Sequence, residues 1–236
     1  MNKKNTSLQI GDIKCELVPG TATDRIVYMI YPEVAPLTET LLGQLSSVCH
    51  LPMAVIYVPS AQWNNYLTPW PEPGEAPGFP PFAGEAPSFL KTLRDDIIPQ
   101  VEKTLGLMPN AARNLMGVSL SGLFTLWTWL QTDLFTSIAC LSGSFWYKGF
   151  IDWFDAQTIP VKTGKAFFLL GRSEPEASVK AYRTVGVDTQ AVVDRLQASG
   201  IDTTFRWVPG NHFNDPAGRA RIGVEFLANA TVNSEK

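Results

Sequence analysis

The sequence predicts an α/β protein, with a mainly parallel central sheet flanked by helices on both faces. Short apolar runs of strand length alternate with stretches of helical spacing, and this alternation is typical of βαβ units. The run from Met53 to Val58 is apolar throughout, as a strand buried on both faces should be. With 236 residues, of which 45% are hydrophobic, the chain is long enough for one substantial core and too short for two comfortable domains. We therefore expect one domain over residues 1–236.

The first quarter of the chain predicts three strands and one helix. The loose alternation from Leu8 to Val18 predicts a first strand, and the β-branched and aromatic residues from Arg25 to Tyr31 predict a second. Two prolines end that strand, and helical spacing follows from Leu37 to Val48. Met53 to Val58 is the third predicted strand.

Residues from about 59 to 87 form a segment crowded with proline, glycine and aromatic residues. Loops of this length in compact domains are usually functional or disordered, and disordered segments are poor in aromatic residues. We therefore predict an ordered loop insertion that packs on its own rings. It follows a central strand, and open α/β sheets bind ligands beyond the carboxyl ends of their strands. The alternative is an aromatic plug that closes part of the core.

The rest of the chain continues the alternation of helices and strands. Ser88 is placed to cap a helix that runs to Leu105, with a kink or break at Pro99. A helix over 178–199 is broken near Gly186. The other predicted elements are a helix over 120–130, strands over 136–141, 165–170 and 203–208, and a closing helix over 216–228.

The stretch from Asn114 to Phe124 has the layout of a nucleophile elbow. An apolar run ends in Gly-x-Ser, and an apolar segment of helical length begins directly after Ser119. Such an elbow needs small flanking residues, because strand and helix approach closely there, and Gly117 meets this need. Ser121 stands where a second glycine is usual, and it is still small. The alternative interpretation is an ordinary strand–turn–helix in which Ser119 caps the helix.

Ser119, Glu174 and His212 each lie just past the carboxyl end of a predicted strand. Their order along the chain, serine then acid then histidine, is the order found in α/β-hydrolases. A serine hydroxyl needs a base to take its proton, and the base needs an acid to hold its tautomer. The chain has two histidines, and His50 precedes a strand, which places it at the opposite end of the sheet. These observations predict a catalytic triad on an α/β-hydrolase fold.

The sequence alone does not decide which residue is the acid of the triad or which N–H groups form the oxyanion hole. Glu176 and, more distantly, Asp188 are alternatives to Glu174, and a Ser–His dyad without an acid is a further one. We expect the backbone N–H of Leu120 to provide half of the oxyanion hole. The loop after Val58, at Ser60 or Ala61, is expected to provide the other half.

Aromatic residues at strand ends predict an apolar or aromatic acyl pocket around the elbow. They are Trp63, Trp70, Trp146, Tyr147 and Phe213.

Four segments of this chain resemble the esterase D-like family of α/β-hydrolases, which includes enterochelin (siderophore trilactone) esterases. They are Gly117–Phe124, Tyr66–Pro71, Leu141–Trp146 and Pro209–His212. The resemblance implies Ser119 as nucleophile and His212 as base. The chain departs from the family at Ser121, where glycine or alanine is usual. It departs again before Thr68-Pro69, where an aspartate is often found.

The composition argues against several classes of protein. A formal net charge of −3 gives no electrostatic basis for binding nucleic acid. The polar start lacks the apolar stretch of a signal peptide, and no run approaches the ~20 apolar residues that span a bilayer. The widely spaced Cys15, Cys49 and Cys140 fit buried free thiols in a reducing cytoplasm. We expect a cytoplasmic protein that needs no metal and no cofactor.

The leading functional prediction is a serine esterase that cleaves a small-molecule carboxylic ester through an acyl-enzyme. The natural substrate is open, with a siderophore-like or aromatic acyl ester as one class. Acyl transfer or thioester hydrolysis at the same site is an alternative, and a non-catalytic binding protein on the same fold is another. The sequence leaves open whether the protein is a monomer or a homodimer, and whether the 59–87 loop is a lid or a dimer contact.

Overall fold

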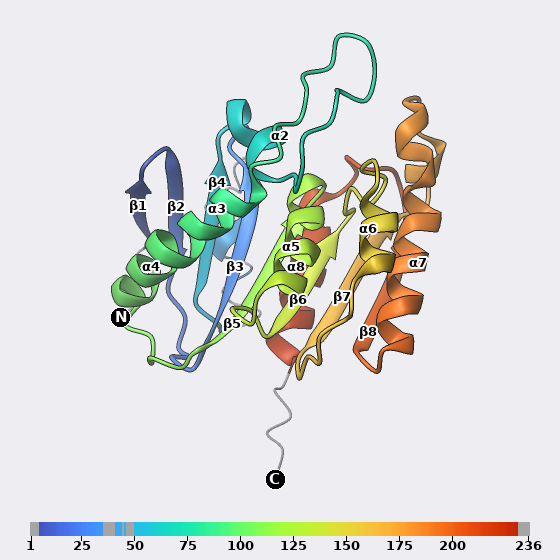
Figure 1. Ribbon diagram of the computed structural model, residues 1–236. Helices are drawn as coiled ribbons and strands as arrows, with labels where there is room; N and C mark the ends of the chain where they lie inside the picture. Colours follow the sequence, from blue (N-terminus) through green and yellow to red (C-terminus); the bar gives the residue numbers. More distant parts are fainter. Residues whose placement is uncertain (1–4, 35–40, 44, 46–49, 231–236) are drawn as a thin grey trace.

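A computed structural model describes residues 5–34, 41–43, 45 and 50–230 of the chain. One eight-stranded sheet has the order β1-β2-β4-β3-β5-β6-β7-β8 (Figure 1). From β3 through β8 the neighbouring strands are parallel, whereas β1 and β2 pair antiparallel at one end. The strands are β1 (Thr6–Ile10), β2 (Ile13–Val18), β3 (Arg25–Pro32), β4 (Met53–Val58), β5 (Ala112–Val118), β6 (Ser137–Leu141), β7 (Lys165–Gly171) and β8 (Asp202–Val208).

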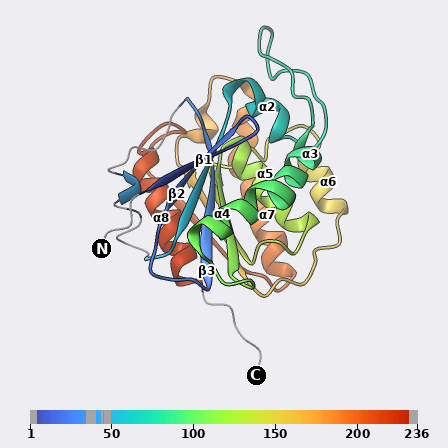
Figure 2. The same cartoon turned by 90° about the vertical axis from the view of Figure 1, so that its left-hand side faces the viewer.

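Helices cover both faces of the sheet, as Figure 2 shows from the side. One face carries α3 (Ala86–Thr92), α4 (Ile98–Leu105), α5 (Leu120–Gln131), α6 (Phe150–Ala156) and α7 (Val185–Ala198), and the other carries α8 (Pro216–Asn229). Two apolar cores result, one on each side. In β3, Tyr28 and Ile30 enter the first core while Val27 and Met29 enter the second, because successive side chains of a strand point to opposite faces. The predicted α/β fold class is thereby confirmed.

The first predicted strand is wrong, because residues 8–18 form a hairpin and not one strand. Strands β1 and β2 pair antiparallel, with Ile10 opposite Ile13. Gly11 sits in the turn at φ 59°, a backbone conformation that glycine adopts without steric cost. The apolar alternation runs on across the turn, so only the glycine marks it.

The helix predicted to start at Ser88 begins two residues earlier. Ala86 is the first residue of α3, and its N–H donates to the carbonyl of Thr68. The prediction that Ser88 caps this helix is therefore wrong. The interruption expected at Pro99 is a π-helical turn, η2 (Leu93–Ile97), directly before α4, whose first turn holds Pro99. This placement suits proline, because the π turn already replaces the regular hydrogen bonds of the α-helix here, and the Ile98 N–H donates to the Leu93 carbonyl five residues back.

Two other helices were predicted, over 37–48 and over 178–199. Of the helix predicted over 37–48, the positions 41–43 and 45 are helical, and the others lie outside the described residues. The helix predicted over 178–199 is divided between a 3₁₀ turn, η4 (Lys180–Thr184), and α7, so it breaks next to Gly186 as expected. No helix in the described part of the chain is long and apolar enough to cross a membrane.

The 59–87 segment is an ordered loop that extends beyond the carboxyl ends of the strands (Figure 1). It begins with the short turns η1 (Ser60–Gln62) and α2 (Trp63–Tyr66), and Glu72 pairs with Phe82 across an isolated β-bridge. Cys15 and Cys140 are buried free thiols, and Cys49 lies outside the described residues.

Candidate active site

Ser119 occupies a sharp turn between β5 and α5, with a backbone conformation that non-glycine residues rarely adopt. Its φ is 59° and its ψ is −125°. Such strain persists only where the surrounding structure holds it. The N–H of Ser119 donates to Leu141 on the neighbouring strand, and its carbonyl accepts from Gly122 and Leu123 in α5. Ser119 therefore has the geometry of a nucleophile elbow and not that of an ordinary helix cap, since its side chain makes no capping hydrogen bond.

Small residues on both sides of Ser119 let the strand and the helix meet. A side chain on Gly117 would place its first carbon 2.1 Å from the carbonyl oxygen of Ser121, closer than atoms can approach. The serine at position 121 is fully buried, and its hydroxyl accepts from the Val118 N–H at 2.7 Å and lies 2.8 Å from the Ile30 carbonyl. Because the hydroxyl is fully hydrogen-bonded, serine fits where glycine is usual.

His212 and Glu174 form a hydrogen-bonded pair at the carboxyl ends of β8 and β7. The His212 Nδ1 atom lies 2.9 Å from the Glu174 Oε2 atom. A carboxylate only accepts, so this contact favours the imidazole tautomer with its proton on Nδ1 and leaves Nε2 free to take a proton. Of the acids weighed from the sequence, Glu174 is the one brought to His212, whereas Glu176 is exposed.

The Glu174 carboxyl is buried and held in its ionised form. Burial alone would raise its pKa, but hydrogen bonds from His212, Ser142 and the Gly171 N–H act in the opposite direction. The net effect is a pKa below the usual range for a carboxyl group. An ionised acid next to His212 is suited to stabilise an imidazolium.

The Ser119 hydroxyl and the His212 imidazole are not hydrogen-bonded to each other. The serine hydroxyl lies 3.5 Å from the Ser144 hydroxyl, and no hydrogen bond among the described residues joins Ser119 to His212. Hydrogen bonds between a nucleophile and its base are often long without substrate and shorten when substrate binds. The structure thus brings Ser119, Glu174 and His212 to the same edge of the sheet, with one of the two expected side-chain contacts formed.

Of the two predicted oxyanion donors, Leu120 is part of the elbow, whereas Ser60 follows a strand that is not next to β5 in the sheet. Leu120 begins α5, so its N–H has no intrahelical acceptor and stands next to Ser119. Ser60 begins η1, and one residue, Pro59, separates it from the end of β4. However, β3 and not β4 is the neighbour of β5, so the turn after β3, at Glu33 and Val34, is one strand nearer.

The five predicted pocket aromatics do not share one environment. Trp146 and Tyr147 help to line a cavity of about 210 Å³, together with Glu72, Glu75 and Phe82. Trp70 packs on Tyr147 and donates its indole N–H to the Lys148 carbonyl. Trp63 packs on the core, whereas Phe213 is 85% exposed beside His212. The rings of the loop therefore serve partly as the aromatic plug that was the alternative interpretation.

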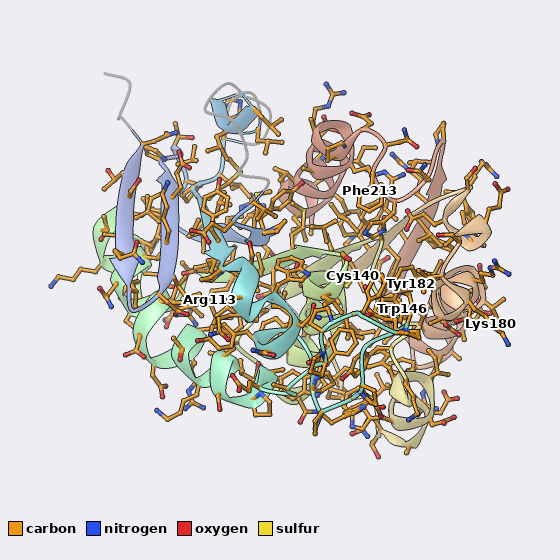
Figure 3. All side chains as sticks on the ribbon, turned by 90° about the horizontal axis from the view of Figure 1, so that it is seen from above. Arg113, Cys140, Trp146, Lys180, Tyr182 and Phe213 are labelled. Atoms are coloured by element: carbon orange, nitrogen blue, oxygen red, sulfur yellow. The ribbon has the colours of Figure 1, made fainter. Side chains whose placement is uncertain are left out.

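Trp146 has a partner that the sequence did not indicate. Its ring lies 4.4 Å from that of Tyr182, centroid to centroid, and Figure 3 shows the two side chains next to each other. The Tyr182 hydroxyl donates to Glu75 of the protruding loop at 3.1 Å. This contact ties the loop to η4 beside the cavity.

Two further residues around Glu174 were also missed. Ser142 and Arg219 both hydrogen-bond its Oε1 atom, at 2.7 Å each. The run of small residues after the sixth strand was visible in the sequence, but an arginine on an amphipathic helix normally indicates an exposed position. Within the described part of the chain, no three His, Cys, Asp or Glu side chains are gathered as a metal ion would require.

The strained serine elbow and the acid–histidine pair, placed on this sheet order, define an α/β-hydrolase-type protein. A family model described as Putative esterase matches residues 31–206, and the chain belongs to this family. The predicted family resemblance is therefore confirmed.

Solved structures share the fold over nearly the whole chain. The siderophore hydrolase EstB from Aspergillus nidulans is 15% identical, with a TM-score of 0.72 over 95% of this chain and 94% of EstB. An IroE-like serine hydrolase from Shewanella oneidensis is 16% identical, with a TM-score of 0.73 over 95% of this chain and 80% of that one.

Among sequence relatives, YbbA from Bacillus subtilis (strain 168) is 25% identical over 145 residues, which are 61% of this chain and 58% of YbbA. The alignment thus spans little more than half of this curated relative.

Proposed function

We propose that this protein is a serine hydrolase that cleaves a carboxylic ester through an acyl-enzyme. The observation that carries the proposal is the backbone of Ser119, held at φ 59° on a strand–turn–helix with the His212–Glu174 pair at the same sheet edge. Membership of an esterase family supports the same reaction class.

The proposed reaction follows from the roles of these three side chains. The Ser119 hydroxyl oxygen attacks the ester carbonyl carbon while His212 Nε2 takes the hydroxyl proton. Glu174 holds Nδ1 and stabilises the imidazolium. His212 then gives the proton to the departing alcohol, which leaves an acyl group on Ser119. A water molecule, deprotonated by the same histidine, releases the acid and restores the serine.

The negative charge that develops on the carbonyl oxygen needs backbone donors. We assign one to Leu120, at the N-terminus of α5, where the helix dipole also favours negative charge. The second donor is the N–H of Ser60 or that of Val34, on the turns after β4 and β3. The reaction needs no metal and no cofactor.

The proposed substrate is a small-molecule ester with an aromatic or siderophore-like acyl part. Trp146 follows two residues after Ser144, whose hydroxyl lies 3.5 Å from that of Ser119, and its ring packs on that of Tyr182, which supports an aromatic group. The cavity that Trp146 helps to line includes none of Ser119, Glu174 and His212. Two structural neighbours are a siderophore hydrolase and an IroE-like serine hydrolase, which supports the siderophore-like class. Buried free Cys15 and Cys140 support a cytoplasmic location.

Steady-state hydrolysis of short aryl esters tests the proposed reaction. We expect Ser119→Ala to lose at least about 10³-fold in kcat, because no other group replaces the nucleophile. The control is Ser199→Ala, which removes an exposed hydroxyl after α7 and should leave kcat unchanged. Equal activity of Ser119→Ala and wild type would refute the proposal.

Product analysis with added alcohol distinguishes ester hydrolysis from acyl transfer, because a transferase diverts the acyl group from water to the alcohol.

A further inference from the structure

Arg219 is a buried cation at a place where a cation is unfavourable. Its side chain is 5% exposed, and it lies in the first turns of α8, near the positive end of the helix dipole. Asp215 caps this helix by accepting from the Gly218 N–H, which fixes where the helix begins. The Nε of Arg219 is buried, and no described residue accepts a hydrogen bond from it. Burial of such a group needs a specific compensation.

The compensation is a set of three contacts that converge on the acid–histidine pair. Arg219 Nη1 donates to Glu174 Oε1 at 2.7 Å and to the Ser142 hydroxyl at 2.8 Å. Arg219 Nη2 donates to the carbonyl of Asn211 at 2.6 Å, and this is the residue directly before His212. One guanidinium therefore holds both the carboxylate and the backbone that carries the imidazole.

The backbone conformation of Ser142 provides independent evidence that the fold maintains this network. The φ of Ser142 is 49°, a conformation that costs free energy for a non-glycine residue. Its buried hydroxyl donates to Glu174 Oε1 at 2.7 Å and accepts from Arg219. The strained backbone of Ser142 thus has a use, since it places this hydroxyl between the acid and the arginine.

The contacts also determine which carboxylate oxygen faces the histidine. Glu174 Oε1 accepts from Arg219, from Ser142 and from the Gly171 N–H at 2.7 Å, so its hydrogen-bonding capacity is filled. Oε2 is the oxygen that remains for His212.

We propose that Arg219 is a positioning residue that, with Ser142, locks Glu174 and the Asn211 backbone so that His212 is held in the tautomer with its proton on Nδ1. Its effect on catalysis rests on the proposed esterase function, whereas its effect on the imidazole does not. The two are therefore measured separately.

Long-range ¹H–¹⁵N spectra of protein labelled with ¹⁵N-histidine measure the tautomer directly. The chain has two histidines, so His50→Asn assigns both rings. At alkaline pH, where a free imidazole is neutral, we expect His212 of the wild type to carry its proton on Nδ1. Arg219→Met should give a mixture of tautomers. Arg219→Lys keeps the charge with fewer donors and should fall between the two.

Arg221→Met is the matched control. Arg221 lies on the same helix, but its side chain is 60% exposed and pairs with Glu225. Its replacement should leave the His212 tautomer and kcat unchanged. If Arg219→Met does not fold, Arg219→Lys and Ser142→Ala decide the question, since each keeps most of the local packing.

In ester hydrolysis we expect kcat of Arg219→Met to fall about 10²-fold, with KM changed less than about twofold, because the acid is displaced but the substrate pocket is intact. A folded Arg219→Met with the wild-type tautomer would overturn the proposal. If wild type shows no hydrolysis, the function proposed above fails. The positioning role is then tested by the His212 tautomer alone. A changed tautomer in Arg219→Met supports this role, and an unchanged tautomer overturns it.

Discussion

Glu174 links the histidine to the rest of the structure, because its two oxygens bind different partners. Replacing it by glutamine keeps the shape but offers His212 an amide, which no longer fixes the tautomer. We predict a loss of up to about 10⁴-fold in kcat for Glu174→Gln. The measurement is steady-state hydrolysis of an aryl ester by the variant and wild type.

Glu176→Gln is the matched control, since Glu176 is an exposed acid two residues further along the chain. It should retain wild-type kcat. A large loss in Glu176→Gln with none in Glu174→Gln would reassign the acid. No loss in either variant would favour a Ser–His dyad.

Glu174 should also make the fold sensitive to acid. Its pKa is lowered in the folded protein, so its contribution to stability is present above the usual carboxyl pKa and is lost as the pH falls toward the lowered value. We predict that the free energy of unfolding decreases over that range, measured by urea denaturation at a series of pH values. Glu174→Gln, which cannot ionise, should show a shallower decrease. Parallel curves for the two proteins would contradict the coupling.

At the residue scale, sequence order was enough to select Ser119 and His212 as candidates, because the strands of a parallel sheet end at one edge. It offered Glu174 as the first choice of acid but did not decide between Glu174, Glu176, Asp188 and no acid. It could not select Arg219, whose partners Ser142 and Glu174 lie 77 and 45 residues away in the chain. The sequence also could not predict which side chains at the site are exposed to solvent. Phe213 follows His212 directly, yet most of its ring faces solvent.

The elbow is the element whose geometry is most constrained. We predict that Gly117→Ala lowers the free energy of unfolding by about 3 kcal/mol, because the added carbon meets the backbone of Ser121. Gly43→Ala is the control, since a side chain at this helical position meets none of the described residues within 4 Å. It should stabilise the fold by about 0.5–1 kcal/mol. Equal effects in urea denaturation would contradict the close approach at the elbow.

At the element scale, the periodicity of the sequence located most strands well and located turns poorly. The hairpin at Gly11 was missed because the apolar alternation continues through it. The π-helical turn before Pro99 was seen as an interruption but not as a π turn, since its geometry depends on how α3 and α4 pack on the sheet. Helix α3 begins at Ala86 for a similar reason, because Thr68 provides the acceptor from outside the helix.

At the scale of the whole molecule, the protruding loop and η4 meet above the sheet edge through Glu75, Tyr182 and Trp146. We predict that Trp146→Ala lowers kcat/KM for aromatic acyl esters about tenfold relative to acetyl esters, because it removes one aromatic wall of the cavity. Paired kinetics on the two ester types measure this ratio.

Trp63→Ala is the comparison, since Trp63 packs on the core and does not line that cavity. Its ratio should match that of the wild type. An unchanged ratio in Trp146→Ala would remove the cavity from the proposed substrate site.

The α/β class and the family were accessible from the sequence, whereas the strand order was not. The order β4-β3-β5 places the turn after β3 next to the elbow, so the second oxyanion donor could not be deduced from chain order alone. Lateral order in a sheet depends on long-range pairing, which leaves no local pattern.

The central claim is that Ser119 is an activated nucleophile, and intact mass after treatment with a fluorophosphonate probe tests it most directly. The probe reacts with serines whose hydroxyl a base has activated, and it needs no knowledge of the natural substrate. We predict one adduct per wild-type chain and none on folded Ser119→Ala. An adduct that survives Ser119→Ala, or no adduct on folded wild type, would contradict the account.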